Sequence, residues 1–576
     1  MFYKVRGIFV NSYWLRTLAM TVILALLVTF GTREFTMRHT LFLFLTSALF
    51  FAEIRLFKDV RSVVKFMAMF FLLGMTVLVI RRYTGFVIRS WDADTYIGFC
   101  MAVVNLFALL VAIVPWKNFK RVIVILEWGI ISPILLVWGY FASTGRWLHA
   151  DAIVAVVQTN PQEAMSYIMD TIAIGSIIGV AGMIILLVKS MSLIVNVRIN
   201  RSVVFRGGII ALLMLLNLVL VYRCRNNVLF EPFYDARNQI VNDMVFSKNR
   251  QQRKSEKIEL VSGGKPGIYV MVVGESQTRD HMNAYGYDRM TTPWLSTLAG
   301  TENFVNISNT YSCYPKTVQA LSYALTAKNQ YNSLAFEQAP SLVEVAKQAG
   351  YQVIWLSTQN KYGMYDTPIT AIARDADSAI WESHCFDEQL AACLDDIKIS
   401  DKMLIIIHLM GNHNTYRERY PQKFAHFAGE KDRIDEYDNS ILYNDFVVQN
   451  IWEKLNKLPN FQALLYFADH GEGVDQGKMH DAGDFEWSMV RIPCYLLVSD
   501  KFRQQNSNMY EVIKENKNYV ITNDLMYNFM LGIMNVRDSK YYEADNDFTN
   551  IGYNKDIKRF MTNYGEKKVY ADMEKE

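Results

Sequence analysis

Long apolar segments dominate the first 222 residues of the chain. Seven stretches are mostly apolar: 14–30, 40–57, 66–80, 95–116, 122–142, 171–188 and 207–222. A helix needs about 20 mostly apolar residues to cross a bilayer, a length that 95–116 reaches. Seven such stretches in series favour membrane helices over the buried helices of a soluble protein. We therefore predict a transmembrane domain of about five to seven helices over residues 1–222.

Loop charges orient this predicted domain. Basic residues precede the first stretch and lie between the second and third, the fourth and fifth, and the sixth and seventh: Lys4, Arg6, Arg55, Lys58, Arg61, Lys65, Lys117, Lys120, Arg121, Lys189, Arg198, Arg201 and Arg206. Because basic loops stay on the cytoplasmic side, the N-terminus is expected inside and the chain after Tyr222 outside. The loop 81–94, with three arginines, fits this orientation poorly, so one early stretch could be only interfacial.

One predicted outer loop contains an amphipathic pattern. In 151–169, Ile153, Val157 and Met165 recur at helical spacing, and Pro161 interrupts them. Such a helix could lie on the outer membrane surface, or it could be an ordinary solvated helix.

The pattern changes after a polar connector, which we place at 223–265. From 266 to 576, five continuous apolar segments alternate with helix-like ones: 268–276, 351–358, 402–413, 463–473 and 492–500. Continuous apolar strands between helices predict a mostly parallel sheet covered on both faces. In such sheets, ligands bind at the carboxyl ends of the strands.

Polar side chains gather at these predicted strand ends. They are Glu275, Ser276, Thr358, Lys361, His413, Asp469 and His470, with His480 in the glycine-rich loop that follows. Carboxylate oxygens and imidazole nitrogens suit zinc or manganese, so the ends predict a metal site. The alternative is a set of ordinary caps and turns.

A hydroxyl with a candidate role lies in 311–328. Pro315 stands near a predicted helix start, and Leu321 and Leu325 follow at helical spacing, which puts Thr317 in the first turn. Free backbone N–H groups there favour negative charge. Next to a divalent metal, Thr317 could be a nucleophile, although a simple helix cap is the commoner role of such a residue.

Composition adds two constraints. The chain has 576 residues with a net charge of +3, so no basic surface suited to nucleic acid is expected. Its 51% hydrophobic content excludes a disordered chain.

Of the six cysteines, Cys385 and Cys393 flank a short segment. An oxidising compartment could join these two cysteines in a disulfide, or they could stay two free thiols.

Six motifs carry a family resemblance. They are VVGESQTRDHMNAYGYDRMTTPWL (272–295), SCYPKTVQAL (312–321), WLSTQNKYGMYDTPI (355–369), HLMGNHNTYRERYP (408–421), YDNSILYNDFVV (437–448) and YFADHGEG (466–473). Together they resemble the membrane-anchored phosphoethanolamine transferases of Gram-negative bacteria, in the alkaline phosphatase and sulfatase superfamily. The resemblance implies a multi-span α-helical membrane domain followed by an α/β sulfatase-like catalytic domain at 266–576.

The resemblance also assigns roles at the strand ends. It implies that Glu275, Asp469 and His470 bind zinc and that Thr317 is the nucleophile on the same zinc. Ser276 is a rival nucleophile by its position beside Glu275. The family places its nucleophile some forty residues after the glutamate, which selects Thr317.

Substrate contacts follow from the same resemblance. Lys361, His413 and His480 match positions that hold the phosphate group or transfer protons. Thr159 and Glu163 match surface-helix residues near the ethanolamine head group. One tight zinc site is implied, and a second metal could bind through His413 and His480.

The implied reaction moves phosphoethanolamine from phosphatidylethanolamine, through a phosphothreonine, to an envelope glycan or lipid such as lipid A or a periplasmic glucan. The implied location is the bacterial inner membrane, as a multi-pass protein, with the catalytic domain in the periplasm. Two alternatives stay open: a phosphoglycerol transferase or lipid phosphodiesterase of the same superfamily, and a catalytically silent membrane sensor or scaffold. The TNPQEA motif within 151–169 favours an ethanolamine donor.

Two departures from the family bear on the acceptor. Relatives that modify lipid A often carry a second cysteine ten residues after Cys313, where this chain has Tyr323. The membrane half also has two apolar stretches more than the usual five. Both departures weigh against lipid A.

Overall fold

A computed structural model describes most of the chain: residues 13–32, 37–84, 90–114, 116–158, scattered positions between 179 and 198, 207–253, 258, 260, 263–359, 367–382, 385–427, 433–480, 482 and 485–574. The chain divides into two compact units, Met1–Gln239 and Ile240–Glu576. The division falls within α12 (Glu231–Arg253), which fills much of the predicted connector. The predicted boundaries at 222 and 265 stay predictions.

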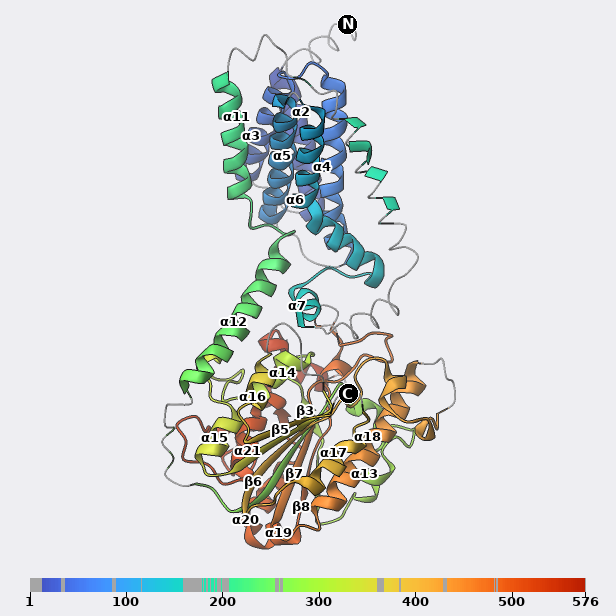
Figure 1. Ribbon diagram of the computed structural model, residues 1–576, viewed down its shortest axis with the longest axis vertical. Coiled ribbons are helices and arrows are strands. Elements are labelled where there is room, and N and C mark those ends of the chain that lie inside the picture. Colours follow the sequence, from blue (N-terminus) through green and yellow to red (C-terminus); the bar gives the residue numbers. More distant parts are fainter. Residues whose placement is uncertain are drawn as a thin grey trace. The chain divides into compact units, whose positions relative to one another are not determined.

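Helices form the first unit (Figure 1). They are α2 (Tyr13–Thr32), α3 (Met37–Ile54), α4 (Val60–Tyr83), α5 (Ser90–Ile113), α6 (Lys117–Thr144), α7 (Ala150–Gln158) and α11 (Gly207–Arg223). α5 contacts α2, α3, α4, α6 and α11, so it is the centre of this bundle. A helix that is apolar on all sides is stable where neighbours cover it on all sides, which is the position that α5 takes.

Two helices of the described residues, Val60–Tyr83 and Asp92–Ile113, are long and apolar enough to cross a membrane. A third would be α6, counted as one span, although its two parts meet at 49°. The apolar helices Leu15–Leu26, Thr40–Ile54 and Gly208–Arg223 are shorter. The short stretch at 66–80 thus belongs to a helix of 24 residues, because its flanking residues continue the helix.

The predicted number of spans and the surface helix are only partly covered by the described residues. Most of the stretch 171–188 lies outside them. Of the amphipathic segment 151–169, the structure describes the part within α7, which ends at Gln158. Five to seven spans and the surface helix stay predictions.

A seven-stranded sheet is the framework of the second unit, in the order β2-β8-β7-β1-β6-β4-β5 (Figure 1). Its strands are β1 (Gly267–Gly274), β2 (Phe304–Ile307), β4 (Gln352–Ser357), β5 (Ser378–Trp381), β6 (Lys402–His408), β7 (Phe461–Ala468) and β8 (Cys494–Val498). The five strands from β7 to β5 are parallel to one another, and β8 is antiparallel to both neighbours. The predicted mostly parallel sheet is therefore confirmed.

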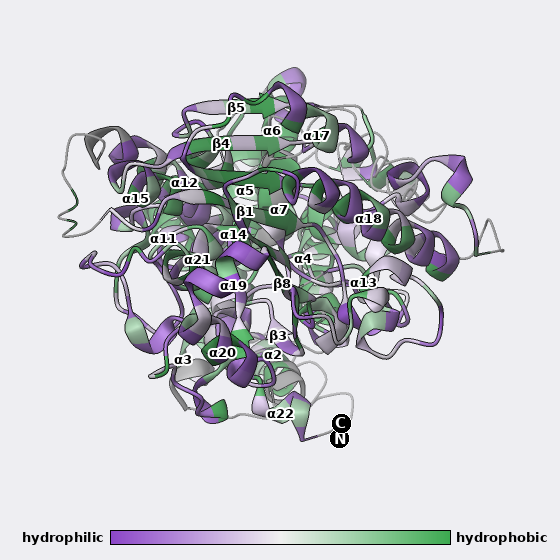
Figure 2. Cartoon of the chain, turned by 90° about the horizontal axis from the view of Figure 1, so that it is seen from below, coloured by the Kyte–Doolittle hydropathy of each residue, from purple (hydrophilic) through white to green (hydrophobic). Residues whose placement is uncertain are grey.

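Helices cover both faces of this sheet (Figure 1). One face carries α14 (Thr317–Ala324), α15 (Leu342–Gln348), α16 (Pro368–Ala373) and α21 (Met526–Ile533), and the other carries α13 (Pro293–Thr297), α17 (Glu388–Cys393) and α18 (Arg433–Leu455). Along β1, alternate residues enter two cores: Tyr269 and Met271 one, Val270 and Val272 the other. Both faces of β1 are buried, which explains why its sequence is apolar without alternation. In Figure 2 the strands β1 and β4 are accordingly coloured as hydrophobic.

A second, smaller sheet lies in the same unit. Its strands β3 (Asn309–Tyr311) and β9 (Val520–Thr522) are parallel, with Tyr311 opposite Thr522. The remaining elements are α19 (Asp500–Gln505), α20 (Ser507–Asn516), α22 (Tyr570–Met573) and the pair β10 (Met561–Thr562) and β11 (Lys567–Lys568). The parallel arrangement brings the residues after β3 and after β9 side by side.

Candidate metal centre

Three buried ionisable side chains meet where β1 and β7 end. Glu275 follows β1, and Asp469 and His470 follow β7. The two strands are neighbours, with Gly274 opposite Ala468, and the Asp469 N–H donates to the Gly274 carbonyl at 3.0 Å. One ligand atom from each of the three side chains lies within 4.8 Å of the others. The predicted ligands are therefore adjacent in the structure.

Thr317 joins this cluster as the first residue of α14. Its hydroxyl donates to Glu275 Oε1 at 3.0 Å and lies 3.2 Å from His470 Nε2. Thr317 is partly exposed, whereas Ser276 is fully buried. The Ser276 hydroxyl also bonds Glu275 Oε1, at 3.0 Å, but solvent does not reach it. Of these two residues, solvent therefore reaches Thr317 and not Ser276.

The orientation of His470 leaves one ring nitrogen for the cluster. Its Nδ1 lies 2.8 Å from the carbonyl of Gly471, and a carbonyl oxygen only accepts, so Nδ1 carries the proton. Nε2 faces Glu275 Oε1 and Asp469 Oδ2, each at 3.4 Å. A neutral His470 thus presents a lone pair at the point where the carboxylates converge.

Burial and mutual charge shift all three pKa values. Burial, together with the charge of Glu275, raises the pKa of Asp469 well above its usual range. Burial also acts to raise the pKa of Glu275, but the hydrogen bond to His470 and the charges of His470, His413 and His408 together outweigh it and the pKa falls. Burial acts to lower the pKa of His470, but the two carboxylates raise it to about 9. The cluster therefore favours an added positive charge.

The donor set fits zinc. Within the described part of the chain, Asp469 Oδ2 is buried and makes no hydrogen bond, although a buried carboxylate oxygen without a partner is costly. Carboxylate oxygens and an imidazole nitrogen are ligands that zinc prefers, and a divalent cation would supply the missing charge. Glu275, Asp469, His470 and the Thr317 hydroxyl are the residues that would hold it.

Neighbouring loops hold Glu275 in place. Its carbonyl accepts from the Asn412 N–H at 2.9 Å, and its Oε2 accepts from Gln359 Nε2 at 3.2 Å. Gln359 Nε2 also donates to the Leu409 carbonyl at 2.9 Å. Gln359 lies two residues after the end of β4, so it is a strand-end residue that the sequence analysis missed.

A tight turn at Gly411 packs against Glu275. Gly411 has φ +52°, and a Cβ there would lie 2.8 Å from the Glu275 backbone nitrogen. The turn is held by Asp387, which accepts from the N–H groups of Met410 and Gly411 at 2.9 and 2.8 Å. A side chain at position 411 would therefore disturb both the turn and Glu275, the first of the predicted metal ligands.

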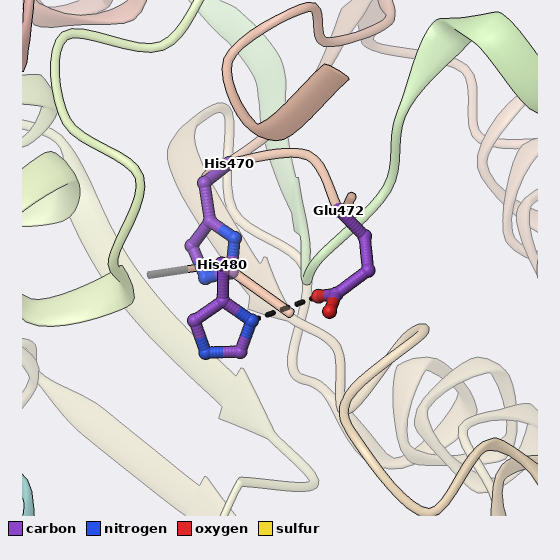
Figure 3. A group of neighbouring side chains, drawn as sticks. All are labelled: His470, Glu472 and His480. Atoms are coloured by element: carbon purple, nitrogen blue, oxygen red, sulfur yellow. Dashed lines mark hydrogen bonds and ion pairs between the residues drawn. The ribbon is translucent and has the colours of Figure 1, made fainter. Parts of the chain in front are cut away.

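A second group extends the site. Figure 3 shows His470, Glu472 and His480, whose ligand atoms also lie within 4.8 Å of one another. His480 Nδ1 lies 2.8 Å from Glu472 Oε2, and the rings of His470 and His480 are 4.3 Å apart. Burial lowers the pKa of His480. The sequence analysis missed Glu472, whose signal was its position two residues after His470.

The remaining predicted site residues divide into two groups. His413 lies close enough to lower the pKa of both Glu275 and His480 by its charge. Lys361, Thr159 and Glu163 lie outside the described residues, so their placement stays a prediction.

Aromatic packing occupies the position of the absent second cysteine. Tyr323 stacks on Tyr564 at 4.6 Å between ring centroids, and Tyr564 lies equally close to Tyr314. The Tyr564 N–H donates to the carbonyl of Cys313 at 3.2 Å.

All six cysteines lie within the described residues and are free, so Cys385 and Cys393 are two thiols in this structure.

Comparisons with known proteins agree with the fold and the motifs. The sequence model of the Sulfatase family matches residues 268–535. Phosphoethanolamine transferase EptC of Escherichia coli K12 is 32% identical over 272 residues, which cover 42% of this chain and 47% of EptC. Phosphoethanolamine transferase EptA of the same strain is 24% identical over 461 residues, 71% of this chain and 82% of EptA. The chain thus spans about half the length of the first curated relatives it matches.

The fold of a solved structure matches most of the chain. It is the integral membrane protein lipooligosaccharide phosphoethanolamine transferase A from Neisseria meningitidis, with a TM-score of 0.57 and 19% identity. The match covers 84% of this chain and 98% of that protein. The predicted combination of a helical membrane domain and a sulfatase-like α/β domain is confirmed, as is the family resemblance.

We expect zinc affinity to rise with pH up to about pH 9. The pKa of His470 is about 9 without metal, so below that pH zinc competes with the proton on Nε2. Release of one proton raises the apparent affinity roughly tenfold per pH unit. Chelator competition on the full chain in detergent, at several pH values between about 6.5 and 9, measures this slope. His470→Gln is the control and should bind weakly; an affinity of the wild type that does not change with pH would contradict the assignment.

Gly411→Ala should weaken zinc binding as well as the fold. The new Cβ would meet the Glu275 backbone at 2.8 Å, and φ +52° adds strain, so we expect a loss of about 1–3 kcal/mol in unfolding free energy. Gly300→Ala is the matched control: φ is +82° there, but nothing lies within 4 Å of the added Cβ. Denaturant unfolding and zinc titration of both variants test this. Equal zinc affinities would show that the contact with Glu275 is unimportant.

Proposed function

We propose that the protein is a metal-dependent phosphoethanolamine transferase anchored in the bacterial inner membrane, with its catalytic domain in the periplasm. The match of residues 268–535 to the sequence model of the Sulfatase family supports this proposal. One observation carries the proposal: the accessible Thr317 hydroxyl donates to Glu275 within a buried group of two carboxylates and an imidazole. The printed names of the relatives, phosphoethanolamine transferases EptC and EptA, support the group transferred.

The first half of the reaction loads Thr317. Its oxygen attacks the phosphorus of phosphatidylethanolamine, forming an O–P bond as the bond to the glycerol oxygen breaks. Glu275 Oε1, 3.0 Å away, orients the hydroxyl, whose proton is released to solvent as the O–P bond forms. Diacylglycerol leaves after taking a proton from His413 or His480, and phosphoethanolamine stays on Thr317.

The position of Thr317 at the start of α14 favours this intermediate. Unpaired N–H groups and the helix dipole stabilise negative charge at a helix N-terminus, where a phosphate on Thr317 would lie. Zinc, when bound, supplies a Lewis acid that favours the ionised hydroxyl and offsets charge on the phosphoryl oxygens. A second metal could bind through His480 with Glu472 and through His413.

The second half of the reaction restores Thr317. An acceptor hydroxyl or phosphate attacks the phosphothreonine, the bond to the Thr317 oxygen breaks, and Thr317 recovers a proton. His413 or His480 takes the acceptor proton when the acceptor is a hydroxyl. Lys361 is proposed to offset charge on the phosphoryl oxygens, and Thr159 and Glu163 to contact the ethanolamine head group.

The membrane unit is proposed to keep the protein in the bilayer that contains the donor lipid. Within its described residues, Val60–Tyr83 and Asp92–Ile113 are long and apolar enough to cross a bilayer, and the donor is itself a bilayer lipid. Confining enzyme and donor to one membrane raises their effective concentration without any further contact. We propose an envelope glycan or lipid as the acceptor, since both are reached from the same surface.

Thr317→Ala should abolish transfer. Loss of a catalytic nucleophile lowers turnover by roughly a thousandfold or more, while Thr317→Ser keeps the hydroxyl and should stay within about tenfold of the wild type. Intact mass spectrometry of the wild type with donor and no acceptor should show one added phosphoethanolamine, absent in Thr317→Ala. Full function of Thr317→Ala in cells would instead favour a membrane sensor or scaffold.

Cells that contain the protein should carry one more phosphoethanolamine group on an envelope molecule. Mass spectrometry of lipids and glycans extracted from cells with the wild type, with Thr317→Ala and without the protein would name the acceptor. The increment should be present only with the wild type. A glycerophosphate increment would replace the proposed donor with phosphatidylglycerol, and release of free head group alone would indicate a lipid phosphodiesterase.

A further inference from the structure

We propose that Asn523 is a positioning residue that sets the place of Thr317 relative to the metal ligands; its consequence for transfer rests on the proposed function. Asn523 follows β9 and begins a short 3₁₀ helix, Asn523–Leu525. Its side chain is fully buried and outside the proposed ligand set. No motif in the sequence singles it out.

The side-chain amide of Asn523 joins the two halves of the site. Nδ2 donates to the backbone carbonyl of Asp469 at 2.6 Å and to Ser312 Oγ at 3.1 Å. Oδ1 accepts from the N–H of Cys313 at 2.8 Å. An amide has two N–H groups and one carbonyl oxygen, so all three polar functions of Asn523 are engaged in this link.

Ser312 completes the link from the other side. Its hydroxyl accepts from Asn523 and lies 2.6 Å from the Asp469 carbonyl and 2.7 Å from the Tyr314 carbonyl, to either of which it can donate. Ser312 is also fully buried. The Asp469 carbonyl therefore accepts from Asn523 and is one of two carbonyls to which Ser312 can donate.

The topology explains why this link is needed. The ligands Glu275, Asp469 and His470 follow strands of the seven-stranded sheet, whereas the loop that leads to Thr317 leaves β3 of the smaller sheet. β3 and β9 are parallel and end together, so Ser312 and Asn523 emerge side by side. The amide of Asn523 then ties this end of the smaller sheet to the backbone of a proposed ligand.

A small displacement of Thr317 would lower the rate of the proposed reaction. Thr317 lies four residues after Cys313, and its oxygen is 3.0 Å from Glu275 Oε1. Misplacement of a reacting group by about 1 Å can lower a rate by about a hundredfold. Asn523 would therefore act on turnover through the position of Thr317, while the three ligands still come from the larger sheet.

Substitutions can separate positioning from general stability. Asn523→Ala removes all three bonds, and Ser312→Ala removes only the hydroxyl and should give a smaller effect in the same direction. The matched control is Asn516→Ala, on α20: Asn516 is also buried, and its Nδ2 donates to the Phe548 carbonyl at 2.9 Å. A purely structural role of Asn523 would make Asn523→Ala and Asn516→Ala alike.

A double-mutant cycle on zinc affinity tests the proposal without activity. Chelator competition is run on the full chain in detergent, with Thr317→Ala made in the wild type and in the Asn523→Ala, Ser312→Ala and Asn516→Ala backgrounds. Thr317→Ala should weaken zinc binding in the wild type and in Asn516→Ala, but several-fold less in Asn523→Ala, because Thr317 is already misplaced. An equal effect of Thr317→Ala in all backgrounds would overturn the proposal.

Turnover provides the second readout. Asn523→Ala should lower kcat for phosphoethanolamine transfer by about tenfold to a hundredfold with little change in KM, and Asn516→Ala should change neither. If the wild type transfers nothing while the cycle shows coupling, the proposed function fails and the positioning role of Asn523 stands. If the wild type is active and Asn523→Ala keeps its kcat, the positioning role is overturned.

Discussion

The burial of two neighbouring carboxylates, Glu275 and Asp469, is the constraint on which the rest of this structure depends. Glu275 and Asp469 are fully buried at adjacent strand ends, and His470 forms ion pairs with both of them. Two carboxylates in such a place are costly unless a cation is present. The neighbouring loops, each bonded to the backbone or side chain of a proposed ligand, hold this arrangement against its own repulsion.

Much of the fold was predictable because burial on both faces leaves a simple pattern. β1, β6 and β7 are continuous apolar runs, and each was expected within a few residues of its observed bounds. β2 and β5 were missed, since each has four residues and is partly exposed. Four residues are too few for the pattern of apolar and polar positions to identify a strand.

The site was predictable only as far as its residues follow strand ends. Glu275, Asp469 and His470 were expected for that reason, whereas the role of Thr317 needed the family resemblance. Asn523 was missed because its contacts are distant in sequence, 54 residues from Asp469 and 211 from Ser312. Nothing local distinguishes a bridging asparagine from an ordinary one.

Division of the site between two sheets has a mechanistic consequence. Three of the proposed ligands, Glu275, Asp469 and His470, follow strands of one sheet, whereas Thr317 is carried by the loop after β3 of the other. Binding and reactivity would then be partly separable in the proposed centre, since the first three would supply most of the affinity for the cation and the bonds around Ser312 would set the position of Thr317. Hydrogen bonds remote from the reacting atoms can tune turnover in such a centre without changing the chemistry that it performs.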